Sequence, residues 1–473
     1  MDGLECSEIL LSKVQETYDF RTEAEFYKKE FVAIHKKLIA LNAAPLTNGL
    51  SSLVTDGTHY TPNYTESGIP FLSALNVQEN YLDVSAGFKY ISAEQHKELS
   101  RRVLPQYKDV LLRKVGVGMR KACVVPKDTF EFSIFVSVAL IRPKINPYLL
   151  STYINSRLGQ LQLLRFNKGI SQPDLHLEDI GRMLVPNFSD VVVQNIESLV
   201  LHCENLFAQS ESAYNDAIAI LNRLLKVDTL DVDQSGISVK TFSESFVVTG
   251  RLDAEYYHKK YDVLFENLSK QNVKYLGGEN GLAVFKKSIE PGSEAYLEEG
   301  VPFIRVSDVD KHEISTPSIM VSKDLVPNIN ELYPKKDTIL LSKDGSIGIA
   351  YKLEKDMEAV TSGALLHLTV KDSNIILPDY LTLVLNSPIV QLQAERDCNG
   401  AIIQHWKPSD IEKVLIPILN MSVQQEIASK VQESFRLRAE SKRLLDLAVK
   451  TVEMAIESDE DTALKWLESK VGQ

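Results

Sequence analysis

The feature that most constrains the fold of this chain is that its sequence repeats itself. The segment "FRTEAEFYKKEF", which begins at Phe20, returns as "GRLDAEYYHKKY" from Gly250, 230 positions later. Five residue types recur at the same spacing, and changes such as Glu23 to Asp253 keep the chemical character. A chain that states one segment twice is expected to fold one structural unit twice.

The repeat keeps its register far beyond these segments. The stretch "GIPFLSALNV" from Gly68 matches "GVPFIRVSDV" from Gly300, and "MLVP" ending at Pro186 matches "VLIP" ending at Pro417. The shifts of 232 and 231 residues are nearly equal, so only small loop changes separate the halves. We infer a tandem duplication of one unit, and not a solenoid, whose period is roughly 20–50 residues. At 473 residues the chain also exceeds the size of one core, which predicts two or more domains.

Each unit is predicted to contain a helical arm, a mixed domain of helices and strands, and a long closing helix. Apolar residues at helical spacing mark the arms, and short apolar runs bounded by Gly and Pro mark the strands. The predicted parts are an N-terminal arm (1–44), a first mixed domain (45–186), a central helix (187–233), a second arm (234–271), a second mixed domain (272–417), a distal helix (418–457) and a C-terminal tail (458–473).

Local patterns predict the elements within these parts. The arm helices span about 20–42 and 250–270, and their apolar stripe packs either against the arm's own domain or against a partner or the other arm. Strands are predicted over 109–115, 121–126, 132–142, 301–309, 337–343, 347–353 and 363–370, and helices over 147–166 and 378–397.

The closing helices have the clearest pattern. Neither 191–225 nor 422–456 contains Pro or Gly, and apolar residues step by threes and fours along both. A helix of 35 residues is about 52 Å long. A stripe this long and narrow favours an antiparallel pair formed with its duplicate, and the alternative is a single helix lying on its own domain. Two similar domains on such a rod could read two separated sites on DNA, whose pitch is ~34–36 Å.

Composition limits the classes of protein that remain. The hydrophobic content of 44% is ordinary, no run approaches the ~18 apolar residues of a membrane helix, and the N-terminus lacks the pattern of a signal peptide. The four cysteines show no CxxC spacing, so we expect a reducing cytoplasm and no metal site. The net charge of −12 conceals a basic block over 45–186 (+4) beside an acidic block over 187–233 (−6), which suggests two different partners.

The segments "GVPFIRVSDV" (300–309), "KDTILLSKDGSIGIAYKL" (336–353) and "QHWKPSDIEKVLIPIL" (404–419), followed by a long helix, resemble the specificity (S) subunits of type I restriction–modification systems. The resemblance covers about 20–456. It implies an α+β protein in which two duplicated α/β target recognition domains are separated by two long antiparallel coiled-coil spacer helices with pseudo-twofold symmetry. It also implies binding to double-stranded DNA, partner methyltransferase (M) and restriction (R) subunits, and a role in phage defence.

Two loops in each mixed domain are predicted to contact DNA. One is rich in Gly and basic residues, which suit close approach to phosphates and contacts with guanine, and the other is polar, with Gln side chains that suit adenine. A third surface in the first domain combines polar and aromatic groups. The predicted DNA-binding residues are Thr58, His59, Tyr60, Arg113, Lys114, Arg120, Lys121, Lys168, Ser171, Gln172, Arg305, Ser307, Lys343, Ser346, Arg396, Gln404, His405 and Lys407.

Each of these loops could instead be an ordinary hairpin whose polar side chains are solvated and bind no DNA. Trp406 and Leu175, which lie within the polar loops, are expected in the core. The second mixed domain is acidic, with 15 Lys and Arg against 21 Asp and Glu. Phosphate contact dominates affinity for DNA, so this domain must gather its cations on one face or share the load with a basic partner.

No catalytic motif is present, so we expect a non-catalytic subunit. Asn146-Pro147-Tyr148 resembles part of the NPPY motif of adenine-N6 methyltransferases, but a proline at a helix start explains it. The resemblance to type I specificity subunits implies that S-adenosylmethionine, ATP and Mg²⁺ are bound by partner subunits. The alternatives are the recognition subunit of a fused (type IIB/IIG-like) restriction–methylation enzyme, and a stand-alone DNA-binding scaffold or repressor.

Overall fold

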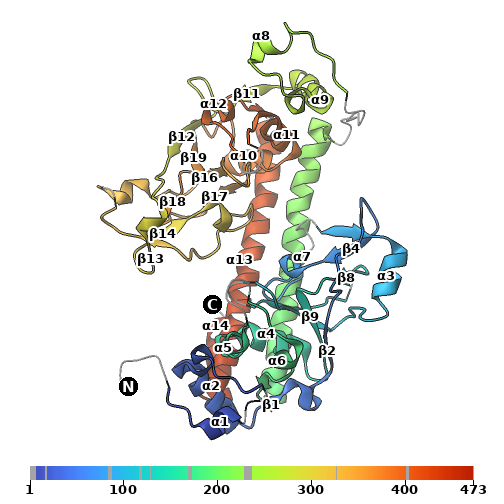
Figure 1. Ribbon diagram of the computed structural model, residues 1–473. Helices are drawn as coiled ribbons and strands as arrows, with labels where there is room; N and C mark the ends of the chain where they lie inside the picture. Colours follow the sequence, from blue (N-terminus) through green and yellow to red (C-terminus); the bar gives the residue numbers. More distant parts are fainter. Residues whose placement is uncertain are drawn as a thin grey trace. The chain divides into compact units, whose positions relative to one another are not determined.

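The computed structural model describes residues 7–15, 17, 19–83, 88–116, 120–127, 129–168, 173–227, 237–325, 327–400 and 404–471. The chain divides into two compact units, one formed by 1–207 with 439–473 and the other by 208–438. The division falls inside two long helices, so each unit holds one mixed domain and part of each helix. Both units mix helices with strands, which confirms the predicted α+β class (Figure 1).

The repeated opening motif forms a local clasp in the first unit. It precedes the 3-10 helix η1 (Ala24–Tyr27) and helix α2 (Lys29–Ala40). The Arg21 guanidinium lies 4.7 Å from the centre of the Phe26 ring, and its Nε donates to Glu23 at 3.0 Å. The Tyr27 hydroxyl donates to the Arg21 carbonyl at 2.8 Å. The motif therefore fixes the turn that leads into the arm helix.

The second unit builds the same clasp before η5 (Glu255–Tyr257) and α9 (Lys259–Ser269). Arg251 stacks on Tyr256 at 4.4 Å and donates to Asp253 at 2.9 Å, and the Tyr257 hydroxyl donates to the Arg251 carbonyl at 3.0 Å. Helices α2 and α9 bury their apolar stripes and contact the mixed domain of their own unit. The prediction that each arm packs on its own domain is thus confirmed.

The first mixed domain contains two four-stranded sheets, with strand orders β2-β9-β6-β7 and β3-β5-β4-β8, and the two-stranded ribbon β1-β10. Apolar side chains from both sheets, including those of Leu72, Leu111 and Leu140, form one core. The strands are β1 (Ala44–Pro45), β2 (Ser51–Asp56), β3 (Tyr64–Thr65), β4 (Ile69–Leu72), β5 (Lys89–Ile91), β6 (Val110–Arg113), β7 (Ala122–Val124), β8 (Ser133–Ile134), β9 (Val138–Pro143) and β10 (Leu184–Val185).

The second mixed domain repeats this topology. Its sheets have the orders β12-β19-β16-β17 and β13-β15-β14-β18, and its ribbon is β11-β20. The strands are β11 (Val273–Tyr275), β12 (Ala283–Lys287), β13 (Tyr296–Leu297), β14 (Val301–Ile304), β15 (Met320–Val321), β16 (Ile339–Ser342), β17 (Ala350–Lys352), β18 (Val360–Thr361), β19 (Leu365–Val370) and β20 (Leu415–Pro417). The equal strand orders confirm the duplication that the sequence predicts.

Two predicted strands are shorter than expected. The run 132–142 is split, because a turn closed by the Val138 amide on the Phe135 carbonyl (2.9 Å) sends β8 and β9 into different sheets. The run 301–309 stops after β14, because the Asp308 carboxylate accepts from the Arg305 amide at 2.8 Å and starts the 3-10 helix η7 (Val306–Asp308). Both breaks are side-chain or turn effects that apolar alternation does not reveal.

The predicted helices over 147–166 and 378–397 are each two helices. Ser156 interrupts the first, and its hydroxyl accepts from the Gly159 amide at 3.2 Å to cap the next helix. Asn146 caps α4 by accepting from two amides, which confirms that the proline beside it starts a helix. The helices of the mixed domains are α3 (Ala93–Leu99), α4 (Pro147–Asn155), α5 (Arg157–Phe166), α6 (Leu177–Gly181), α10 (Pro378–Leu385), α11 (Pro388–Asp397) and α12 (Pro408–Ile411).

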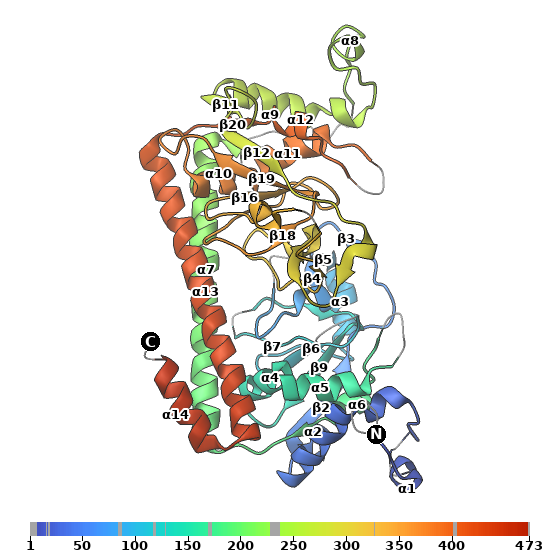
Figure 2. The ribbon, with the colours of Figure 1, turned by 90° about the vertical axis from the view of Figure 1, so that its left-hand side faces the viewer.

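The two long helices are α7 (Asp190–Leu225) and α13 (Met421–Glu457), each within two residues of its predicted bounds. They pair within each unit (Figures 1 and 2). In the second unit the Ser210 hydroxyl donates to the Ser434 carbonyl at 2.8 Å, and Lys430 meets Asp216 at 3.0 Å, so the pairing is antiparallel. Small side chains at these positions let the helices approach closely.

The same helices pair in the first unit through the Ser441 hydroxyl, which donates to the Cys203 carbonyl at 2.9 Å. The C-terminal segment, predicted as a tail, forms helix α14 (Glu460–Val471) and buries Ala463 and Leu467. The remaining elements are short: α1 (Leu11–Gln15), α8 (Phe246–Thr249), η2 (Leu46–Leu50), η3 (Ala74–Asn76), η6 (Ser293–Ala295) and η8 (Ile329–Leu332). Among the described residues, no helix combines the length and apolar character needed to cross a membrane.

Aromatic contacts fasten each mixed domain to its part of the long helices. In the first unit the Tyr81 ring lies 4.5 Å from that of Phe207 on α7. In the second unit the His312 ring lies 4.6 Å from the Tyr214 ring of α7 and 6.2 Å from the Phe435 ring of α13. Each domain therefore contacts its part of the long helices through aromatic rings.

Candidate nucleic-acid interface

The glycine-rich loop and the polar loop of the first unit lie side by side. Their backbones are joined directly, because the Gly116 amide donates to the Pro173 carbonyl (3.1 Å) and the Leu175 amide donates to the Lys114 carbonyl (3.0 Å). Gly116 has a φ of 115°, which favours glycine at this turn. These bonds use main-chain atoms, so the loops hold their relative position whatever side chains they carry.

The second unit joins its two loops by the same bonds. The Gly345 amide donates to the Gln404 carbonyl (2.9 Å), and the Trp406 amide donates to the Lys343 carbonyl (2.8 Å). Trp406 is 1% exposed, in agreement with its predicted place in the core, as is Leu175 in the first unit at 0%. The structure thus brings together the two loops that the sequence nominates, once in each domain.

Two cations predicted to face DNA are instead buried. The Lys114 ammonium lies 3.4 Å from Asp56 Oδ2 and 3.3 Å from Asp174 Oδ1. Arg120 is 1% exposed and donates to Asn167 Oδ1 at 2.7 Å. Burial lowers the pKa of the Arg120 guanidinium. These side chains hold the loops together, which corrects the prediction that they form surface contacts.

Three further cations of the first unit are partly occupied by the protein itself. Arg113 is half-buried and donates to the Val77 carbonyl at 3.0 Å, and Lys121 donates to Gln78 Oε1 at 2.7 Å. The Lys168 ammonium lies 3.1 and 3.4 Å from two carboxylates. Their contact with DNA stays a prediction, and any such contact competes with these internal partners. Two predicted residues lie outside the described residues: Ser171 and Gln172.

The described part of the loop pair of the second unit carries a cluster of charged and polar side chains. His405 Nδ1 lies 2.7 Å from Asp344 Oδ1, and the Lys343 ammonium pairs with the other carboxylate oxygen of Asp344. Lys343 is only 16% exposed and so is turned into this pair. In these two loops the exposed members of the predicted set are Ser346, Gln404, His405 and Lys407. Ser346 and Gln404 also line a cavity of about 580 Å³.

The remaining predictions for the second unit fall into two groups. Arg305 is half-buried and Ser307 is exposed, both beside the start of η7. The Arg396 guanidinium lies 4.1 Å from the centre of the Phe265 ring and donates to Asp397 Oδ1 at 2.8 Å. Arg396 therefore also contacts the arm helix α9 through Phe265, and its contact with DNA stays a prediction.

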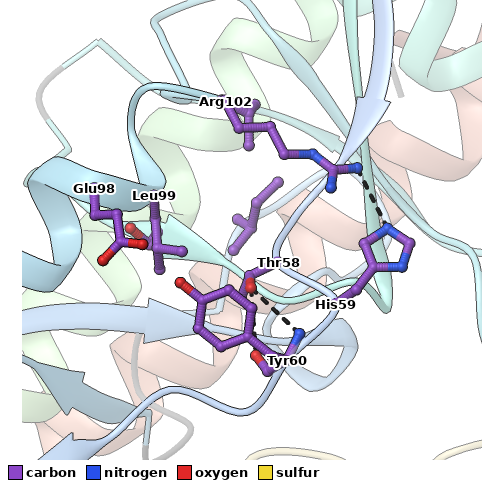
Figure 3. Close-up of a pocket in the computed structure, with 9 residues that line it drawn as sticks. Thr58, His59, Tyr60, Glu98, Leu99 and Arg102 are labelled. Carbon is purple, nitrogen blue, oxygen red and sulfur yellow. Dashed lines mark hydrogen bonds between the residues drawn. The ribbon is translucent and has the colours of Figure 1, made fainter.

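The third predicted surface of the first domain lines a pocket of about 240 Å³ (Figure 3). The Asp56 side chain is 2% exposed and contacts two residues that line the pocket: its Oδ1 accepts from Arg102 Nη2 at 2.6 Å and lies 3.1 Å from His59 Nε2. The His59 and Arg102 side chains are more than half exposed. The lining residues are Thr58, His59, Tyr60, Glu98, Leu99, Arg102, Val103, Ser133 and Ile134.

A close backbone contact builds this pocket. A Cβ atom on Gly57 would lie 1.9 Å from the Ile134 carbonyl oxygen, so only glycine lets the loop reach β8. Thr58 then pairs with Phe135 in a parallel bridge. Sequence reasoning missed Arg102, because its separation of 46 positions from Asp56 leaves no local signal of the pair.

The two units place opposite charges at equivalent positions of this edge. Asp56 ends β2 and Lys287 ends β12, and each is followed two residues later by a parallel bridge. Lys287 thus stands where the first unit has Asp56, and Glu290 stands where it has His59. Glu290 accepts from the Ser362 hydroxyl at 3.0 Å. The same strand arrangement therefore carries different side chains at this edge in the two units. Among the described residues, no group of three or more His, Cys, Asp or Glu could hold a metal ion.

Comparisons with known proteins show which proteins this chain resembles. Residues 280–445 match the family model described as "Type I restriction modification DNA specificity domain". A curated relative, the type I restriction enzyme EcoBI specificity subunit of Escherichia coli, is 23% identical over 269 residues, which cover 53% of this chain and 55% of the relative. The chain therefore spans about half the length of the curated relative that it matches.

Two solved structures of S subunits also align with most of this chain. The type I restriction–modification S subunit from M. genitalium aligns with 89% of this chain and 94% of its own, at 14% identity and a TM-score of 0.32. The HsdS subunit from Thermoanaerobacter tengcongensis aligns with 87% of this chain and 96% of its own, at 16% identity and a TM-score of 0.28. The family match over 280–445 and the curated relative confirm the resemblance of the chain to the specificity subunits of type I restriction–modification systems.

Proposed function

We propose that the chain is the DNA sequence-specificity subunit of a type I restriction–modification complex. Each recognition domain reads one half of a bipartite, asymmetric DNA target. The paired helices α7 and α13 set the spacing between the two halves and dock methyltransferase subunits. The mechanism is one of positioning, in which this chain selects the DNA site and its partners perform the chemistry.

One observation carries the proposal. Two domains of identical strand order join equivalent loops by the same backbone bonds, and yet those loops bear different side chains. Base identity is read by side chains, whereas a common backbone fixes how they are presented. The arrangement suits two readers of unlike half-sites, and the family match over 280–445 supports DNA as the polymer that they read.

The partners follow from this role. The chain acts with two M subunits and with R subunits, and it has no catalytic residue of its own. S-adenosylmethionine, ATP and Mg²⁺ act on those partner subunits, in the cytoplasm. A fused restriction–methylation enzyme is not favoured, because the family match and the curated relative both carry the description of type I systems. A stand-alone repressor is disfavoured for the same reason.

The proposal is tested by sequencing the methylated bases of a host with and without this gene. Loss of the gene should remove one split motif that carries modified adenine in both halves. A matched chain that carries changes only in the loops of the second domain, such as Gln404→Ala with Lys407→Ala, should alter one half of that motif and leave the other. If every motif persists without the gene, the chain does not direct methylation and the proposal is wrong.

A further inference from the structure

We propose that the pocket beside Thr58 and Tyr60 in the first domain binds a phosphodiester group of DNA, with Arg102 as its principal ligand. This inference rests on the proposed function and concerns the first domain, whose Asp56 and His59 are replaced by Lys287 and Glu290 at the equivalent positions of the second. It is carried by the anchoring of Arg102, by the neutralisation of the carboxylate that anchors it, and by the apolar and aromatic wall beside it.

The first step is the anchoring of the guanidinium. Arg102 Nη2 donates to Asp56 Oδ1 at 2.6 Å and lies 3.3 Å from His59 Nε2. Asp56 is almost fully buried, whereas the Arg102 side chain is 51% exposed. One amino group of Arg102 is therefore fixed by Asp56, while half of the side chain stays open to solvent, which leaves the rigid guanidinium fork able to donate to a phosphate.

The second step is the charge balance around the anchor. The buried Lys114 ammonium lies 3.4 Å from Asp56 Oδ2 and 3.3 Å from Asp174 Oδ1, so two cations and two carboxylates balance within this network. Of the four groups only Arg102 lines the pocket, so its guanidinium is the group of the network that a ligand arriving from solvent meets. Glu98 is the carboxylate that lines the pocket, and Figure 3 shows it beside Leu99, on the side away from the Arg102 guanidinium. An anion is accordingly directed to the side where Arg102 and His59 lie.

The third step concerns the shape of the ligand. The volume of about 240 Å³ equals that of several water molecules at ~30 Å³ each, which is enough for a phosphate with its sugar. The Tyr60 ring is 49% exposed and offers a flat face to that sugar. Val103 and Ile134 add an apolar wall. A phosphodiester in a strand combines an anion with an apolar neighbour in this way, unlike a free inorganic anion.

The test measures binding of the full chain to a fluorescein-labelled DNA duplex of mixed sequence by anisotropy, over a series of KCl concentrations. Each phosphate contact contributes about 0.9 to the slope of log K against log salt. Arg102→Gln should weaken binding roughly tenfold and lower that slope by about 0.9. Arg102→Lys should keep most of the slope, and Tyr60→Ala should weaken binding while the slope is kept.

The matched control is Arg101→Gln, which removes the same charge from the neighbouring exposed residue. Equal effects of Arg101→Gln and Arg102→Gln on the slope would overturn the pocket assignment while the proposed function stands. A wild-type chain that shows no salt-dependent binding to the duplex would overturn both. Thermal unfolding of each variant confirms that it is folded, and Tyr60→Ala supplies an independent readout if Arg102→Gln is not.

Discussion

Acid should loosen the second unit through a single buried ring. His312 is 7% exposed and lies between the Tyr214 ring of α7 and the Phe435 ring of α13. Burial, together with the nearby charges of Arg438 and Lys311, lowers its pKa from an ordinary value of 6.5 to about 2. Below pH 6.5 the unfolded chain therefore binds a proton that the folded chain does not, and stability falls as the pH falls.

The size of this effect follows from the two pKa values. On going from pH 7 to pH 5, the protonation of His312 in the unfolded chain lowers the free energy of unfolding by about 2 kcal/mol. His367 is 3% exposed with a pKa lowered by burial to about 4, and it adds a similar amount. Together they remove about 4 kcal/mol, a large share of the ~5–15 kcal/mol that stabilises an ordinary domain.

The substitution that isolates the effect is His312→Phe, which keeps a flat ring between Tyr214 and Phe435 and removes the titrating group. Its stability should equal that of the parent at pH 7 and exceed it by about 2 kcal/mol at pH 5. Urea unfolding followed by the fluorescence of Trp406, in a Trp466→Phe background, reports on this unit alone because the chain has two tryptophans. If the difference between the two chains does not grow on acidification, the His312 ring is not excluded from water and the reasoning fails.

Three further predictions follow from other parts of the chain. Gly57→Ala should lower the free energy of unfolding of the first unit by at least about 2 kcal/mol in urea titrations, because its Cβ meets the Ile134 carbonyl at 1.9 Å; an unchanged midpoint would contradict the close contact. Burial raises the pKa of Glu204 to about 7. The folded chain therefore becomes less stable as the pH rises through 7, because the buried carboxyl loses its proton. Glu204→Gln should be more stable than the parent by up to about 3 kcal/mol at pH 8 and equal to it at pH 4. Four residues, about 6 Å of helix, inserted at facing positions of α7 and α13 should lengthen the gap in the methylated motif by about two base pairs, and an unchanged gap would argue against their role in spacing.

Much of the fold was predictable because the patterns that specify it are local in the sequence and occur in both repeats. The absence of Pro and Gly, with apolar residues every three or four positions, placed α7 and α13 within two residues of their ends. The breaks at Ser156 and after Ile304 were not predictable, because each depends on one side chain that caps a turn while the apolar pattern runs on. Periodicity finds a buried face but does not report where the backbone changes direction.

The candidate interface was predictable as loops but not as side chains. The glycines and polar residues located the two loops that the backbone joins in each unit. Basic residues in such a loop can face solvent or neutralise a carboxylate from elsewhere in the chain, and the loop sequence does not distinguish these outcomes. Lys114 illustrates the second case, because its partners Asp56 and Asp174 lie about sixty residues away on either side. Arg102 shows the opposite outcome. It is a surface residue outside these loops, and the distant Asp56 carboxylate fixes its guanidinium.

The duplicated frame suggests how such a chain can change what it reads without losing its fold. The bonds between Gly116 and Pro173 and between Gly345 and Gln404 are made by main-chain atoms, so a new loop side chain costs little stability as long as it stays exposed. The edge that carries Asp56 in one unit and Lys287 in the other shows that even a reversal of charge is accommodated at one position of the sheet. Buried cations such as Arg120 are constrained differently, because their loss leaves polar partners unpaired. Specificity should therefore diverge first at exposed loop positions such as Gln404 and Lys407, while the residues that tie the loops together change slowly.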